Sequence, residues 1–317
     1  MHACIVVFFP EYGLFTALVF GGALMVTSEG TKVKVLLDLN SLNTRLGAVM
    51  LAAGAIDDVF EVLFLAIVVG MAHGGGFIGL VRIPFELIAF VVVAFIFFKI
   101  ISKVLPYLDR NGSKDGTELF SMVIIFILVL AGLSEIFQLG YLIGAIVGGF
   151  LLQVSMKGIR RQHRRDIMKV TKLITLGFIV PFFFANIGLN FDLSTVFSNV
   201  PLLLATVAIA CFGKILGTLI VKPLSSLNLK QLYYVGWAMN SRGAAELVIA
   251  LIAMQYGLIP PPIFSALVAM SIITTVTFPP ILARGMTKNP GLMKAKSSKK
   301  EKTRQPNKNV GKLFVPS

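Results

Sequence analysis

Three acidic residues stand close together in an otherwise apolar stretch of the sequence, residues 45–70. Asp57 and Asp58 are adjacent and Glu61 follows one helical turn later, so a helix places all three on one side. Two carboxylates side by side in a poorly hydrated site cannot both ionise cheaply, and a proton or a cation has to compensate. These residues therefore predict a site where a proton is exchanged for a metal cation. A static salt-bridged network without transport is the alternative.

Lys214 is the basic residue that matches these acids. It lies in the middle of a second apolar stretch, residues 198–221. A lysine at that depth must either pair with an acid or lose its proton. Snorkelling of the side chain to the membrane surface is the other explanation for a lysine in such a segment. We expect a buried ion pair.

Polar residues interrupt two further apolar stretches, LMVTSEGTKVKVLL at 24–37 and WAMNSRGAAELVIA at 237–250. They include Thr27, Ser28 and Glu29 in the first, and Asn240, Arg242 and Glu246 in the second. Helix breaks in matching positions of two halves indicate an inverted-repeat transporter, whose exposed backbone ends can bind ions. Arg242 and Glu246 are also spaced for an ion pair within one helix. A structural pair and a role in shaping the site both remain open.

The elements that must position these residues are membrane-spanning helices. Of the 317 residues, 56% are hydrophobic and only 14% are charged, whereas a soluble domain carries about 25% charged residues. An all-α polytopic membrane protein follows. A spanning helix needs about 20 mostly apolar residues, and no secretory signal with a cleavage site precedes them. The predicted spans lie near 14–37, 45–70, 78–104, 118–138, 139–155, 170–190, 198–221, 231–257 and 262–285.

The net charge of +14 is concentrated in every second loop and in a polar tail, residues 287–317. The basic loop residues include Lys32, Lys34 and Arg45, then Lys103, Arg110 and Lys114, the run 157–165, and Lys222 and Lys230. By the positive-inside rule these loops and the tail are cytoplasmic. We expect a disordered tail that lies near anionic lipid headgroups, or one that binds a partner. Binding to nucleic acid is not expected, because no folded segment outside the apolar runs could carry it.

Several motifs resemble one family, in order along residues 10–285. LNTRLGAVMLAAGAIDDVFEVLFLA resembles the ion-binding helix of the monovalent cation:proton antiporters, second branch, which includes sodium/proton antiporters and Kef-type potassium-efflux proteins. ALMVTSEGTKVKVLLDLN resembles the crossing helix before it. FIVPFFFANIGLNFDL, KILG and MNSRGAAELVIA resemble the segments that follow.

The resemblance implies roles that spacing alone does not give. Asp58 would be the main cation ligand and proton carrier, and Asp57 would pair with Lys214 until sodium binds. Thr27 would help to line the site. The residues that shape it would be Glu61, Ser28, Glu29, Asn240, Arg242 and Glu246. We expect no enzymatic reaction and no cofactor, only the transported ions Na⁺, Li⁺ or K⁺, and H⁺.

The implied fold is the inverted-repeat sodium/proton antiporter fold with two discontinuous crossing helices. A transport bundle, residues 1–70 and 196–286, would move like an elevator against dimerisation-side helices at 118–195, with 71–117 as linker helix and loop. A homodimer in the cell membrane is expected. Family members begin with roughly four more helices, so this chain resembles one that lacks its N-terminal part.

Two departures from the family pattern leave alternatives open. Many members have Arg-Gly-Glu at the second break, whereas this chain has Arg242-Gly243-Ala244 and carries its acid at Glu246. The soluble regulatory domain of Kef-type proteins is absent from the sequence. A sodium/proton antiporter is the first expectation, a Kef-like potassium efflux protein or K⁺:H⁺ antiporter the second, and a truncated, non-transporting remnant the third.

Overall fold

Helices make up the described part of the chain, which in this computed structural model comprises residues 13–72, 76–111 and 117–288, and no strand occurs in these ranges. The all-α class is confirmed. The predicted tail falls almost wholly outside the described residues. The helices are α2 (Gly13–Ala23), α3 (Glu29–Asp38), α4 (Arg45–Ala72), α5 (Gly76–Asn111), α6 (Thr117–Ile136), α7 (Tyr141–Ser155), α8 (Arg161–Ile174), α9 (Val180–Asn190), α10 (Leu193–Ser198), α11 (Val200–Ile220), α12 (Leu229–Ala238), α13 (Ala244–Gln255) and α14 (Pro261–Lys288).

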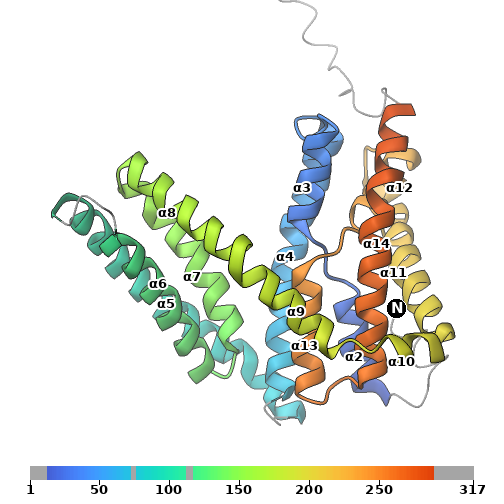
Figure 1. Cartoon of the computed structure of the whole chain (residues 1–317), viewed down its shortest axis with the longest axis horizontal. Helices are drawn as coiled ribbons and strands as arrows, with labels where there is room; N and C mark the ends of the chain where they lie inside the picture. Colours follow the sequence, from blue (N-terminus) through green and yellow to red (C-terminus); the bar gives the residue numbers. More distant parts are fainter. Residues whose placement is uncertain (1–12, 73–75, 112–116, 289–317) are drawn as a thin grey trace, which may run out of the picture.

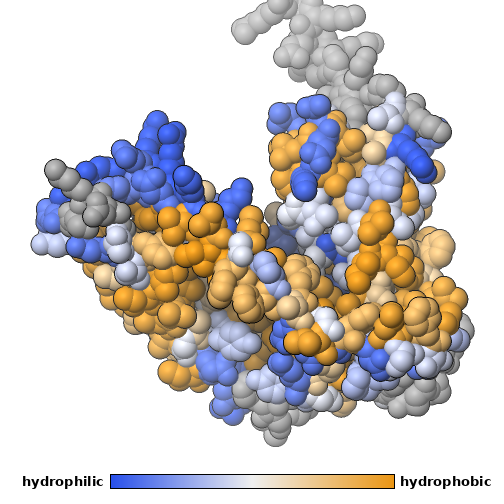
Figure 2. Space-filling model, in the orientation of Figure 1, coloured by the Kyte–Doolittle hydropathy of each residue, from blue (hydrophilic) through white to orange (hydrophobic). Residues whose placement is uncertain are grey.

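Six stretches among the described residues are long and apolar enough to cross a membrane. They are Arg82–Asn111, Thr117–Ile136, Tyr141–Gly158, Arg161–Asn190, Val200–Ile220 and Pro261–Thr287. The protein is therefore a multi-pass membrane protein. Figure 2 shows hydrophobic residues over the middle of the molecule and hydrophilic residues gathered at its upper end, over the start of α8. The other three predicted spans are α4, which carries the three acids, and the pairs α2–α3 and α12–α13, which are interrupted.

The helices form two groups with α4 between them (Figure 1). In one group α6 packs against α7, and α5 packs against both. In the other group α11 packs against α12 and α14, and α13 packs against α2, α4 and α14. Helix α5, which was predicted to be a linker, contacts α4 as well as the α6–α7 pair. The division into transport and dimerisation bundles stays a prediction.

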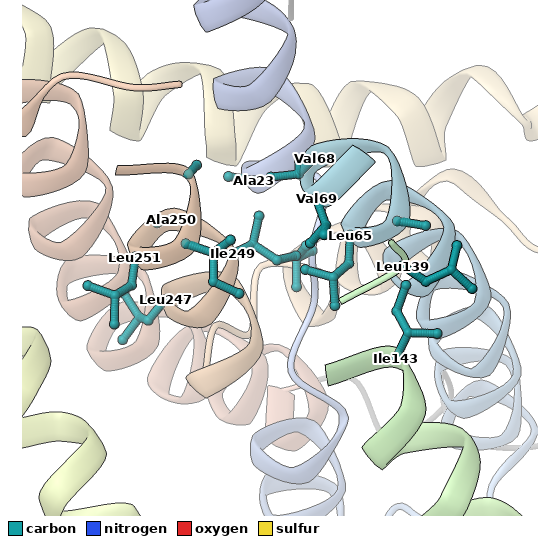
Figure 3. Close-up of a cluster of buried hydrophobic side chains, with 14 of the residues drawn as sticks. Ala23, Leu65, Val68, Val69, Leu139, Ile143, Leu247, Ile249, Ala250 and Leu251 are labelled. Carbon is teal, nitrogen blue, oxygen red and sulfur yellow. The ribbon is translucent and has the colours of Figure 1, made fainter. Parts of the chain in front are cut away.

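The second half of α4 anchors this helix in the apolar core. Leu65, Val68 and Val69 are buried there, in one cluster with Ala23 of α2 and Ile249 of α13. Figure 3 shows this part of α4 between α13 on one side and the start of α7 on the other. Because one end of α4 is fixed by apolar packing, the acids in its middle are held at a defined place.

Each of the two interrupted spans consists of two shorter helices. Helix α2 ends at Ala23 and α3 begins at Glu29, while α12 ends at Ala238 and α13 begins at Ala244. The breaks thus fall in the predicted stretches, at residues 24–28 and 239–243. Glu29 and Gly30 do not lie in the break, because they form the first turn of α3.

The span predicted at 170–190 is part of a longer helical segment, Arg161–Asn190, in which a single π-helical turn at Thr175–Ile179 joins α8 to α9. The prediction of a basic loop at 157–165 was therefore only partly right, since α8 already begins at Arg161. Basic residues are common in loops, but this is a statistical correlation, and they do not by themselves end a helix. The basic residues of α8 share a helix with apolar ones such as the buried Ile167, so they can stay solvated without ending the helix.

Candidate cation site at the crossing of two broken helices

The two helix breaks lie directly against each other. The amide of Ser28 donates a hydrogen bond of 2.8 Å to the carbonyl of Ser241, and the Ser241 hydroxyl donates one of 2.9 Å to the carbonyl of Ser28. Gly243 permits this approach, because a Cβ atom at that position would lie 2.5 Å from the Ser28 hydroxyl oxygen. Two segments more than 200 residues apart in sequence therefore form one polar crossing inside an apolar protein.

Two cationic side chains sit at the C-terminal end of α2. Nη1 of Arg242 donates to the carbonyl oxygens of Leu24 and Val26, at 2.9 and 2.8 Å. Nζ of Lys214 donates to the same Val26 carbonyl, at 3.0 Å, and to the hydroxyl of Thr27. The last carbonyls of a helix have no partner within the helix and carry the negative end of its dipole. Positive charge is therefore placed where the break exposes acceptors.

Acidic side chains sit at the N-terminal ends of the two helices that follow the breaks, α3 and α13. Glu29 lies in the first turn of α3 and Glu246 in the first turn of α13, where the dipole favours negative charge. A carboxylate oxygen of Glu246 lies 3.4 Å from Nη1 of Arg242, and both side chains are fully buried. The ion pair for which these two residues are spaced is thus present.

The C-terminal end of α12 is satisfied by neutral groups. The hydroxyl of Thr27 donates to the carbonyl of Met239 at 3.3 Å, which ties the first break to the second. The side-chain amide of Asn240 donates to the carbonyl of Gly236 at 3.1 Å, but its oxygen is buried without a hydrogen-bond partner. Thr27, Ser28 and Asn240 all therefore lie in the crossing.

Asp57 faces this crossing from α4. Its carboxylate oxygen Oδ2 lies 3.9 Å from Nζ of Lys214, is buried, and has no hydrogen-bond partner. A cavity of about 300 Å³ adjoins the pair and is also lined by Gly217, Thr218 and Met239. The lysine is thus held more closely by Val26 and Thr27 than by the acid, and the acid keeps an unoccupied acceptor beside an open space.

The other two acids of α4 are placed differently from Asp57. Asp58 is exposed, whereas Glu61 is half-buried. Asp58 interacts electrostatically with Glu29, Lys32 and Asp57, in that order of strength. Among the described residues no group of three or more His, Cys, Asp or Glu side chains is arranged to hold a metal ion together. The three acids therefore do not form one compact ligand set in this structure.

Lys32 is the residue of this region that the sequence analysis missed. It was placed in a basic loop, but it lies in α3 with a fully buried side chain, and Nζ is 2.5 Å from a carboxylate oxygen of Glu29. Nζ also donates to the carbonyl of Met50 on α4, at 3.4 Å. The spacing of Glu29 and Lys32, three residues apart, could have indicated the pair. Lys214 is thus not the only buried lysine.

Comparison with known proteins identifies the family. The sequence model described as "Sodium/hydrogen exchanger, transmembrane" matches residues 1–284. The chain belongs to the sodium/hydrogen exchanger family. The monovalent cation:proton antiporter resemblance is confirmed at this level, while the assignment to the second branch stays a prediction.

Three relatives of this chain illustrate the range of the match. The chain is 28% identical over 274 residues to the Na(+)/H(+) antiporter NhaS4 of Synechocystis, covering 84% of this chain and 65% of the relative. It is 27% identical over 268 residues to a Na(+)/H(+) antiporter of Enterococcus hirae, with 84% and 68% covered. It is 26% identical over 267 residues to the Na(+)/H(+)-K(+) antiporter GerN of Bacillus cereus, with 84% and 67% covered. The chain thus spans about two thirds of the length of these relatives.

Proposed function

We propose that the protein is a secondary antiporter that exchanges a monovalent cation, in the first place Na⁺, for protons. The observation that carries the proposal is the buried oxygen of Asp57, which has no hydrogen-bond partner, lies 3.9 Å from Lys214 and borders a cavity. A buried acceptor without a partner is costly, and a cation or a proton at that oxygen removes the cost. Asp58, the next residue, supplies the main cation ligand and proton carrier in this scheme.

The contacts of Lys214 suggest how the ion pair could break at little cost. When a cation takes the carboxylate of Asp57, the ammonium keeps its bonds to Val26 and Thr27 and to the negative end of α2. The lysine is therefore never left without a partner. In this scheme a cation, a proton and Lys214 compete for the same pair of acids, and a transport cycle that involves the lysine moves net charge.

The choice of cation rests on the relatives. Two of the three described above are named Na(+)/H(+) antiporters, and GerN is named a Na(+)/H(+)-K(+) antiporter. Potassium exchange is therefore the second candidate function. Flux into proteoliposomes with Na⁺, Li⁺ and K⁺ compared side by side separates the two. A rate that is highest with K⁺ would replace sodium by potassium in the proposal.

The remaining features are proposed from the family resemblance. The transport bundle moves as a unit against the dimerisation-side helices in a homodimer, and the protein lies in the cell membrane with its C-terminal tail in the cytoplasm. Asp57 and the two lysines lie near the crossing, so a movement of the crossing as one body would carry a cation bound at Asp57 with it. The alternative is a protein that keeps these sequence motifs but does not transport ions.

The substitution Asp58→Asn tests the transport site. It removes the charge that a cation needs and the group that carries the proton, so we expect cation-driven proton flux to be abolished while the protein still folds. Asp38→Asn, in the last turn of α3 and exposed, is the matched control and should retain flux. Normal flux in well-folded Asp58→Asn would overturn the site, and no flux from the wild type would favour the non-transporting alternative.

A further inference from the structure

Lys32 is a buried charge to which the proposed transport reaction assigns no role. Its side chain has no exposed surface, and its ammonium contacts one carboxylate, Glu29, at 2.5 Å. A buried charge is costly to desolvate, and removing one partner of such a pair destabilises a protein more than replacing both. Simple stability would be served as well by two apolar side chains, so this pair invites a functional explanation.

The carboxylate of Glu29 lies against α4 at Gly54, and we call this position the seat of Glu29. A Cβ atom at Gly54 would lie 1.6 Å from a carboxylate oxygen of Glu29, so any larger residue would displace the acid. Nζ of Lys32 reaches the same helix one turn earlier, at the carbonyl of Met50. The pair is therefore fixed against α4 at two points, although both of its residues belong to α3.

The seat of Glu29 lies next to Asp58. Gly54 and Asp58 are four residues apart and so lie on the same face of α4. Glu29 acts on Asp58 electrostatically more strongly than Asp57 does, and Lys32 acts on it in the opposite sense. The two charges of the pair thus act in opposite senses on the residue that holds the cation in the proposed function.

We propose that Glu29 and Lys32 are a positioning pair that sets the cation affinity of Asp58. Lys32 fixes Glu29 in the seat at Gly54 and offsets its charge, so the field at Asp58 comes from both. This inference rests on the proposed function. It predicts that each charge can be removed with an effect of opposite sign on the same quantity, the half-saturating cation concentration.

The experiment measures cation-driven proton flux of the full chain in proteoliposomes at a fixed alkaline pH, where competition by protons is small. Lys32→Met leaves Glu29 unopposed and should lower the half-saturating Na⁺ concentration by roughly three- to tenfold. Glu29→Gln leaves Lys32 unopposed and should raise it by a similar factor. The maximal rate should change much less in both, because Asp58 is intact.

Two further variants separate this effect from a general loss of structure. The double substitution Glu29→Gln with Lys32→Met restores the charge balance and should return the half-saturating concentration to within about twofold of the wild type. Lys32→Arg keeps the positive charge, so its half-saturating concentration should also stay close to that of the wild type. Gly54→Ala displaces Glu29 without changing any charge, so it should also shift the half-saturating concentration. Its control is Gly132→Ala in α6, where a Cβ atom would meet nothing, and this variant should keep the wild-type half-saturating concentration.

Lys34→Met is the matched control for Lys32→Met, because Lys34 lies on the same helix and is exposed. Stabilisation of the purified protein by Na⁺, measured as the rise in melting temperature, gives a readout of binding that is independent of flux. If both single variants keep wild-type half-saturation and wild-type stabilisation while Asp58→Asn abolishes both, the pair is structural and the inference is wrong, but the transport site stands. If Asp58→Asn changes neither, the proposed function fails as well.

Discussion

The ammonium of Lys214 lies near three oxygens, a backbone carbonyl, a hydroxyl and a carboxylate. The difference between these distances decides whether the lysine can release the carboxylate. Val26 and Thr27 lie within hydrogen-bond distance of its ammonium, whereas Asp57 is 3.9 Å away. A lysine whose only partner was Asp57 would lock the acid and keep cations out. Held as it is, Lys214 can compete with a cation without blocking it.

The substitution Lys214→Gln tests this competition. Removing the charge should reduce the dependence of flux on membrane potential and lower the stability of the cation-free form, while some exchange is retained. The measurement is flux with the potential clamped to zero and then set by a potassium–valinomycin gradient. Lys230→Gln, at the exposed start of α12, is the control. Wild-type dependence on potential in Lys214→Gln would show that the lysine is only structural.

The Arg242–Glu246 pair allows a prediction about stability. Both side chains are fully buried, and Arg242 also holds the carbonyls of Leu24 and Val26. Glu246→Gln leaves a buried arginine without its counter-charge and should destabilise the protein by about 3–5 kcal/mol. Thermal unfolding in detergent measures the change.

A surface pair of the same spacing supplies the control for that measurement. Nε of Arg82 lies 3.6 Å from a carboxylate oxygen of Glu86 on α5, and the pair is partly exposed, with the arginine side chain 65% and the glutamate side chain 19% exposed. Exposed pairs contribute about 0–1 kcal/mol, so Glu86→Gln should have little effect. Equal losses of stability in Glu246→Gln and Glu86→Gln would show that the buried pair at the crossing contributes no more to stability than the pair on α5.

At the scale of elements, the sequence predicted the helix breaks well because interruption of an apolar run is a local signal. Thr27, Ser28 and Asn240 stood out by type, and all three lie in the crossing. Burial of Lys32 is a long-range result, since it depends on how α3 packs against α4, and no local pattern reports it. The early start of α8 was missed because basic residues favour a loop only statistically.

The short helix α10 depends on its N-cap. Asp192 accepts hydrogen bonds from the amide and hydroxyl of Ser194, at 2.9 and 2.7 Å, and from the hydroxyl of Thr195. The bonds from Thr195 and Ser194 lower the pKa of Asp192 from 3.8 to about 2. Because the folded-state pKa is depressed, the cap stabilises α10 fully above the ordinary pKa and loses this effect only as the pH falls through about 2.

Removing the cap with Asp192→Ala should therefore loosen α10 to the same extent at pH 7 and at pH 5. Hydrogen exchange of residues 193–198, corrected for the intrinsic rate at each pH, should be faster than in the wild type by a similar factor under both conditions. Ser198→Ala, at the other end of α10, should leave the first turn unchanged. A difference that is present at pH 7 but absent at pH 5 would contradict the low pKa.

At the scale of the whole molecule, the predicted orientation in the membrane rests on where the basic residues lie. Figure 2 shows hydrophilic residues over the start of α8, and Figure 1 places the last turn of α3 and the end of α14 toward the same end of the molecule. The short segment around α10 lies toward the opposite end. The basic connections after α3 and before α8 thus lie toward one end of the described structure, and the non-basic segment around α10 lies toward the other.

Single cysteines test this orientation. In a background without Cys4 and Cys211, Gln162→Cys at the exposed start of α8 should resist an impermeant thiol reagent added outside intact cells, and Asn199→Cys next to α10 should react. Labelling after permeabilisation is the control for accessibility of both cysteines. Reaction of Gln162→Cys from outside would invert the orientation and place the tail on the other side of the membrane.

The crossing also has a consequence for biosynthesis. The carbonyls of Leu24 and Val26 receive their bonds from Arg242, and 218 residues separate Leu24 from this arginine. At about 5–20 residues per second, a ribosome needs roughly 10–40 s to extend the chain from one to the other. In hydrocarbon, each unsatisfied backbone group costs several kcal/mol. The first broken helix must therefore stay near water or the insertion machinery until most of the chain has been made, so its membrane insertion is completed late although it is synthesised early.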